Sequence, residues 1–425
     1  MRTGLFVLGL FLLSLPAVCQ QVCYSSEYRE QLIAHTPGLA ARIEAIETFT
    51  RDFLNRNKTE VNGNANTSTS TGMDIVTIPV IVHVLYNNAS QNISDAQIRS
   101  QIDVLNKDFR RLNADTVRTP DVFKPFAADP GFQFELARMD PNGYACSGII
   151  RKYTPIQAFN INDDMKYSAR GGDDAWDCDN YLNIWVVSLT SGILGYSSVV
   201  GGPKAVDGIT VQYSAFGTTG TAAAPFNGGR TATHEIGHWL NLIHTWGDAI
   251  CGDDRVADTP PQKGPNYGCP SAIAVTCGSG PYGDMYMNYM DFTNDNCMNL
   301  FTNGQTERMR AIFAPGGPRY PLLSTQVLTA IPMPDTPATR SVQEAAGGRL
   351  SIYPNPASSV IYVQSSETIH TGMTLEIYNS MGQRVMTTSL NQAVQAVNVS
   401  TLGPGMYYVI KIDGSSRSVA KMMKL

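Results

Sequence analysis

Three of the six histidines in the chain fall within one short segment, HEIGHWLNLIH, at residues 234–244. If this segment is helical, His234 and His238 lie one turn apart, so both imidazoles can bind one metal ion. Glu235 then lies beside the metal, where a carboxylate can take a proton from metal-bound water. His244 can be the third ligand if the chain turns sharply, which leaves one open position at a tetrahedral zinc. The spacing therefore predicts zinc-dependent hydrolysis.

The sharp turn depends on Asn241, which lies between the second and third histidines. A helix commonly ends in a left-handed residue, usually glycine and sometimes asparagine. Asparagine there costs about 1 kcal/mol relative to glycine, so Asn241 still allows His244 to reach the metal. The competing interpretation is a helix with surface histidines and no metal. The correctly spaced third histidine favours the metal site.

The chain begins MRTGLFVLGLFLLSLPAVCQ, and its positive start, short apolar run and small residues predict a signal peptide over residues 1–19. The apolar run is too short to span a bilayer, and no later stretch is apolar enough to do so. We therefore expect an exported protein with no transmembrane segment. The net charge of −5 argues against nucleic acid as the main partner.

The rest of the chain divides by composition into four parts. A leading segment with helical periodicity and a polar linker covers residues 20–73, and a catalytic domain is expected at 74–322. This domain alternates β-branched runs with helical patterns, such as the strand expected at 74–87 and the helix at 94–113 capped by Ser94, and so predicts an α/β or α+β fold. A Pro/Ala-rich linker follows at 323–349. Short β-rich runs and turns at 350–425 predict an all-β sandwich.

Several separate motifs resemble those of the pappalysin family of metzincin peptidases. HEIGHWLNLIH is similar to the long zinc signature of the metzincins, and the segments CGDDRVADTPPQ and MNYMDFTNDNCMNLFTNGQTERM resemble pappalysins in particular. The resemblance covers roughly residues 75–320. It implies a twisted sheet with an active-site helix and a secreted zinc endopeptidase. His234, His238 and His244 would be the zinc ligands, Glu235 the general base and acid, and Met290 the methionine of the turn beneath the metal.

The chain departs from this family at Phe292, where members usually carry tyrosine. A phenylalanine cannot donate a hydrogen bond, and losing one transition-state donor typically costs about 3 kcal/mol. We therefore expect slower turnover unless Tyr286 or Tyr289 compensates. Phe292 and Asn241 also motivate a hypothesis from another class of protein, a surface adhesin built on a decayed protease fold.

An acidic loop, CGDDRVADTPPQ, follows the histidine motif. One interpretation is a solvated acidic turn. The resemblance instead implies structural calcium, a cation that collects carboxylate, hydroxyl and carbonyl oxygens from such loops. The calcium ligands expected on this basis are Asp253, Asp254 and Thr259.

Export makes disulfides the default state of the cysteines. The resemblance implies the pairs Cys251–Cys277 and Cys269–Cys297, and Cys146 with Cys178 would be a third. The connectivity does not follow from spacing.

Cys23, close to the expected signal-peptide junction, is the odd cysteine. Since a thiolate is a good zinc ligand, the leading segment could hold Cys23 in the open position and keep the enzyme latent as a zymogen. Cleavage within residues 50–72 would release it. The alternative is an incidental free thiol.

The final segment resembles the C-terminal sorting domain of the type IX secretion system, through SIYPNP, the YNSMGQ turn, LGPGMYYVIKI and the basic end KMMKL. This resemblance implies passage through the periplasm, translocation by the type IX machinery, and release or attachment at the cell surface. A substrate- or carbohydrate-binding module is the competing interpretation. Neither the physiological protein substrate nor the oligomeric state follows from the sequence.

Overall fold

The computed structural model describes residues 23–63, 74–190, 192–328, 350–365, 369–370, 372–379, 383–413 and 416–424. The predicted signal peptide at 1–19 lies outside the described residues, as do parts of both predicted linkers, at 64–73 and 329–349. Internal contacts divide the chain into two units, Met1–Met333 and Pro334–Leu425, and each is described by itself.

The first unit contains five α-helices among the described residues: α1 (Ser25–His35), α2 (Leu39–Gly63), α3 (Asp95–Asp108), α4 (Arg230–Trp239) and α5 (Asn303–Ala311). Its described strands are β1 (Val76–Tyr86), β2 (Ala127–Ala128), β3 (Phe132–Leu136), β4 (Ile149–Tyr153), β5 (Leu182–Val187), β6 (Gly195–Ser197), β7 (Ile209–Gln212) and β8 (Phe301–Thr302). The unit therefore contains both helices and strands, with six consecutive strands, β2 to β7, between α3 and α4.

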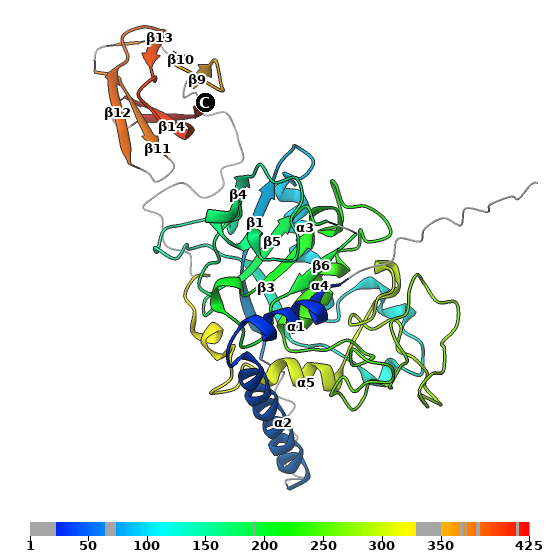
Figure 1. Ribbon diagram of the computed structural model, residues 1–425. Coiled ribbons are helices and arrows are strands. Elements are labelled where there is room, and N and C mark those ends of the chain that lie inside the picture. The colour runs from blue at the N-terminus through cyan, green and yellow to red at the C-terminus, as the bar shows by residue number, and fades with distance from the viewer. Residues whose placement is uncertain are drawn as a thin grey trace, which may run out of the picture. The chain divides into compact units, whose positions relative to one another are not determined.

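A mixed sheet forms the centre of this unit, in the order β3-β1-β5-β7-β6, with β4 also paired to β1 (Figure 1). The sequence VTIPVIVHVLY of β1 is almost wholly buried, as expected for a central strand covered on both faces. β3 and β4 pair in parallel with successive halves of β1, and β5 pairs in parallel along its other edge. Only β6 runs antiparallel, and it forms the edge of the sheet next to α4.

Local signals explain where the helices begin. Ser94 caps α3 by accepting from the backbone N–H of Gln97, as its position predicts. The helix ends at Asp108 rather than at residue 113, because Arg111 adopts a left-handed conformation with φ 47°. α5 begins with a capping box made by Thr302 and Gln305. α3 packs against β3 and α4, which fixes the position of α4 below the sheet edge.

The leading segment folds as two helices on the surface of residues 74–328, the remainder of the first unit, which we call the catalytic unit. α1 lies beside β6, and α2 packs against α5 (Figure 1). The structure extends α2 to Gly63, so residues 50–63 of the predicted cleavage region are helical. The leading segment therefore contacts β6, the strand next to α4, and separately contacts helix α5.

The long connection from α4 to α5 has little regular structure and contains two disulfides, Cys251–Cys277 and Cys269–Cys297, with Cα–Cα distances of 5.6 and 5.7 Å. These are the two pairs that the resemblance implied. The third expected pair, Cys146 with Cys178, is not formed, and both residues are free thiols. The thiol of Cys146 contacts the carbonyl of Ala137 at 3.4 Å, whereas Cys178 is buried where desolvation raises its pKa to about 12.

The second unit is an antiparallel β-sandwich, as predicted. Its described strands are β9 (Leu350–Tyr353), β10 (Val360–Ser365), β11 (Thr374–Asn379), β12 (Arg384–Ser389), β13 (Val394–Asn398), β14 (Gly405–Asp413) and β15 (Ser416–Lys424). They form two sheets, β13-β10-β9 and β12-β11-β14-β15. Alternating residues of both sheets, including Ile361, Val363, Leu375, Ile377 and Val409, form its core.

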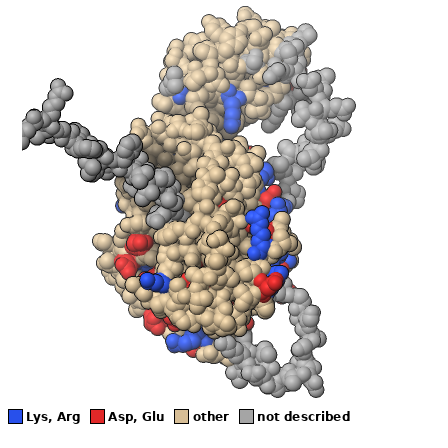
Figure 2. Space-filling view, turned by 90° about the vertical axis from the view of Figure 1, so that its right-hand side faces the viewer, with Lys and Arg blue, Asp and Glu red and all other residues tan. Residues whose placement is uncertain are grey.

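The surface shows no broad separation of charge on the face drawn in Figure 2, where positive and negative side chains are interspersed among mostly uncharged residues. None of the helices in the described part of the chain has the length and apolar character that crossing a membrane requires.

Candidate active site

Helix α4 and the turn after it bring the three histidines together. His234 and His238 lie on one face of α4, and Asn241 then adopts the left-handed conformation with φ 75°. The backbone N–H of Leu242 returns to the carbonyl of Gly237 at 2.9 Å, which closes the turn. Asn241 therefore makes the turn expected of it, and the chain reaches His244.

The Nε2 atoms of the three histidines lie 3.1 to 3.3 Å from one another. Tetrahedral zinc with ordinary Zn–N bonds would place two such nitrogens about 3.3 Å apart. The opposite ring nitrogens are also engaged: Nδ1 of His234 donates to Tyr289 O at 2.7 Å, and Nδ1 of His238 donates to Leu242 O at 3.0 Å. These bonds leave Nε2 free for a metal. The donor set and its spacing fit zinc.

Burial supports the same conclusion. It lowers the pKa of His234 and His238, with further lowering from the neighbouring histidines, so both rings are neutral and able to bind a cation. Nδ1 of His244 contacts the carboxylate of Asp248, a partner that sequence reasoning missed. The sequence did contain a signal for this contact, because Asp248 follows His244 by four residues.

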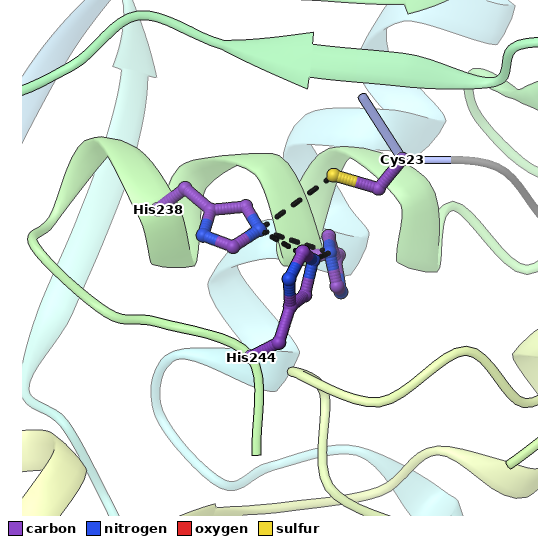
Figure 3. A group of neighbouring side chains, drawn as sticks. Cys23, His238 and His244 are labelled. Carbon is purple, nitrogen blue, oxygen red and sulfur yellow. Dashed lines mark hydrogen bonds between the residues drawn. The ribbon is translucent and has the colours of Figure 1, made fainter. Parts of the chain in front are cut away.

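Cys23 reaches the same point from the leading segment. Its sulfur lies 3.6 Å from Nε2 of His238, and the side chains of Cys23, His238 and His244 converge in Figure 3. Zinc bound to one sulfur and one nitrogen in tetrahedral geometry would set those ligands about 3.6 Å apart. Burial raises the pKa of the Cys23 thiol, so a bound cation is needed to hold it as a thiolate.

Glu235 points at the same space. Its Oε2 accepts a hydrogen bond from Ser25 Oγ at 2.8 Å and contacts the Cys23 sulfur at 3.5 Å. Burial raises the pKa of Glu235 to about 8. A Cβ on Gly195 would lie 3.0 Å from the Glu235 side chain, so glycine at the edge strand β6 makes room for this carboxylate. Ser25 is a second contact of the leading segment that the sequence did not reveal.

Met290 lies directly beneath α4. A Cβ on Gly237 would come within 2.4 Å of the Met290 sulfur, so the helix and the turn below it touch at glycine. Met290 is fully buried, and its N–H donates to the Asn288 side chain at 2.9 Å. Met290 therefore packs against the helix that carries His234 and His238.

Phe292 packs against the histidine cluster. Its ring centroid lies 5.6 Å from that of His234 and 4.9 Å from that of His244. Tyr289 instead packs on Phe301 in the core, and Tyr286 packs in a separate cluster. Neither phenol ring packs on a histidine of the cluster, although the Tyr289 carbonyl binds His234, and among the described residues Phe292 pairs with one phenol ring, that of Tyr267.

Phe292→Tyr should therefore raise kcat. The new hydroxyl would extend from a ring already placed against the histidine cluster, and one transition-state donor is worth about 3 kcal/mol, or roughly a hundredfold in rate. Steady-state kinetics of the mature variant on one peptide substrate would measure this, with Tyr267→Phe as the control for the other phenol. An unchanged or lower kcat would show that the hydroxyl is irrelevant in this chain.

Of the three calcium ligands expected in the acidic loop, only Asp254 and Thr259 contact each other. Asp254 is buried and accepts from the Thr259 hydroxyl at 2.7 Å and from the Val256 N–H at 3.1 Å. Burial raises the pKa of Asp254 to about 7. Asp253 is exposed, and its carboxylate accepts from the N–H of Arg255. The residues present leave Asp254 as a buried carboxylate that a cation would stabilise.

Known proteins resemble this chain in sequence. The family model described as pregnancy-associated plasma protein-A matches residues 166–314. Extracellular metalloprotease 1 of Coccidioides posadasii is 32% identical over 249 residues, covering 56% of this chain and 77% of the relative. An extracellular metalloprotease of Verticillium alfalfae is 32% identical over 251 residues, with the same two coverages. The chain belongs to the pappalysin family.

Solved pappalysin structures show the same fold. Mature mirolysin of Tannerella forsythia, in complex with a cleaved peptide, is 48% identical, with TM-score 0.58, and the match covers 59% of this chain and 97% of mirolysin. A promirolysin mutant from the same organism is 44% identical, with TM-score 0.64, and that match covers 71% of this chain and 97% of promirolysin. These findings confirm the predicted metzincin-type fold and show that the chain is a metallopeptidase.

The second unit is also accounted for. Residues 351–424 match the model of a secretion system C-terminal sorting domain. This finding confirms the predicted sorting domain, and with the extracellular relatives it identifies a secreted protein.

Proposed function

We propose that the chain is the latent precursor of a secreted zinc endopeptidase, with zinc held by His234, His238 and His244. The observation that carries this proposal is the convergence of three Nε2 atoms at tetrahedral spacing, with the Glu235 carboxylate beside them. A peptide bond in a protein is the substrate class that this site and family support.

Glu235 has the position and the environment of a general base and acid. Zinc, when bound, polarises the scissile carbonyl and makes water a stronger acid. Glu235 would take the proton from that water at Oε2 and deliver it to the departing amine. In the precursor, burial raises the pKa of Glu235 to about 8. The carbonyls of Tyr289 and Leu242 keep the histidine rings oriented.

Latency would come from the leading segment. Cys23 fills the fourth ligand position, while Ser25 engages Glu235 and also accepts from the N–H of Ser197 at 2.9 Å. Both the metal position and the general base are therefore covered at once. Because α2 continues to Gly63, we place the activating cleavage after this helix, in the later part of residues 50–72.

Metal analysis combined with a proteolysis assay tests this function. The purified mature protein should contain about one zinc per chain, cleave an unfolded protein, lose that activity to a chelator and regain it with added zinc. A zinc-loaded protein that cleaves nothing in a broad peptide library would instead favour the adhesin hypothesis. Asn241 no longer supports that hypothesis, because it makes the required turn.

We also propose that calcium stabilises the loop of Asp253, Asp254 and Thr259. Support comes from the family resemblance and from the buried Asp254 carboxylate beside the Thr259 hydroxyl. Calcium at about 100 times its Kd should add about 2.7 kcal/mol to the free energy of unfolding. Thermal melting with and without calcium, at constant zinc, measures this. Asp254→Asn should abolish the shift, and a wild-type midpoint that ignores calcium would contradict the proposal.

A further inference from the structure

Helix α2 of the leading segment inserts one carboxylate between two arginines of the catalytic unit. Glu47 Oε1 accepts from Arg308 Nη1 at 2.9 Å, and Oε2 accepts from Arg308 Nη2. Arg255 Nη1 lies 2.9 Å from the same Oε2. Arg308 thus grips the carboxylate with both terminal nitrogens, the two-pronged geometry in which guanidinium recognises carboxylate best.

The arginine pair is built into the catalytic unit rather than into the leading segment. The Arg308 side chain is 2% exposed, and its Nε donates to the carbonyl of Asn241 at 2.7 Å, so the guanidinium is fixed from behind. Arg255 is 36% exposed. Within the described part of the chain, Glu47 is the only ion-pair partner of either arginine. Burial raises the pKa of Asp254, Arg308 offsets only part of that rise, and the two make no ion pair.

The arginines line the same cavity as His238, one of the three expected zinc ligands. This cavity lies between the leading segment and the catalytic unit. The catalytic unit contributes lining residues that include Ser197, His238, Asn241, Asp248, Arg255 and Arg308. The leading segment contributes Ser25 near the metal position and Glu47 at the arginines. His238 and the two arginines therefore line one cavity, part of whose wall belongs to the leading segment.

Removal of α2 takes away the carboxylate that Arg308 and Arg255 share, whereas the bond from Arg308 Nε to the Asn241 carbonyl does not involve α2. Two neighbouring guanidinium groups without a carboxylate partner attract an anion. We propose that Arg255 and Arg308 form a subsite of the mature enzyme that binds an acidic side chain of the peptide substrate. In the precursor, Glu47 occupies this subsite as a substrate glutamate would. The inference rests on the proposed endopeptidase function and adds a preference in substrate class.

Matched peptides test the subsite. The mature enzyme is assayed on C-terminally amidated peptides of one sequence in which Glu and Gln are exchanged at each position in turn. At one position Glu should give about tenfold higher kcat/KM than Gln, because a hydrogen-bonded charge pair is worth about that factor. Amidation removes the terminal carboxylate, so the preference can come only from the side chain.

Arg255→Gln is the first variant, since Arg255 is partly exposed while loss of the buried Arg308 endangers folding. It should reduce the Glu/Gln ratio at that position to about threefold or less. Arg308→Lys, which keeps the charge but loses the two-pronged grip, should also lower the ratio. Arg138→Gln, at an arginine outside the cavity, is the matched control and should keep the wild-type ratio.

Three outcomes would overturn the subsite. Glu and Gln peptides cleaved equally at every position would do so, as would a wild-type ratio in Arg255→Gln, or a preference seen only with a free C-terminal carboxylate. Failure of the proposed function looks different, because the zinc-loaded wild type would then cleave none of the peptides.

Discussion

Glu235→Ala should lower kcat/KM for peptide hydrolysis by about 10²–10⁴-fold while leaving the zinc content at one ion per chain. The variant removes a carboxylate that contacts both Ser25 and Cys23 beside the histidine cluster. General base and acid catalysis typically contributes a factor of this size. The histidines keep their own partners, Tyr289 O and Leu242 O, so metal binding should persist.

The measurement pairs metal analysis with steady-state kinetics on mature protein. Glu135→Ala provides a matched control, because Glu135 is a partly exposed carboxylate on β3 that pairs with Arg138 away from the site. The control should retain wild-type kinetics. If Glu235→Ala keeps more than a tenth of the wild-type kcat/KM at full zinc content, Glu235 is not the general base.

The sequence predicted the centre of the site well because that centre is local. His234, Glu235 and His238 sit on one helix, and the turn at Asn241 depends on one residue whose left-handed preference is known. Hydrophobic strands and a capping serine likewise placed the sheet and α3 to within a few residues. Short-range physics is enough for all of these features.

Long-range contacts were not predictable in the same way. The Cys146–Cys178 pair failed because a disulfide depends on where two distant segments lie, and the two thiols have different surroundings in the fold. The contact of Glu47 with Arg308 joins residues 261 positions apart, and no local pattern marks it. Such contacts come only from the packing of α2 on α5.

The position of the leading segment makes latency the most informative property to test. Cys23 continues the edge of the sheet, since it forms a β-bridge with Gly195 and Tyr24 N–H donates to Gly195 O at 3.1 Å. This backbone pairing holds the sulfur over the histidines. Loss of the sulfur should therefore free the metal position even when the rest of the segment remains docked.

Cys23→Ala should raise the peptidase activity of the uncleaved precursor at least tenfold and speed its maturation. Hydrolysis of a short peptide is measured before processing is visible on a gel, so that activity belongs to the precursor. Cys146→Ala is the matched control, because Cys146 is also a free thiol but lies away from the histidines. Since Ser25 still engages Glu235, the gain should stop short of mature activity. A Cys23→Ala precursor that is as inactive and as slow to mature as wild type would exclude the cysteine as the switch, and latency would then rest on the docked helices alone.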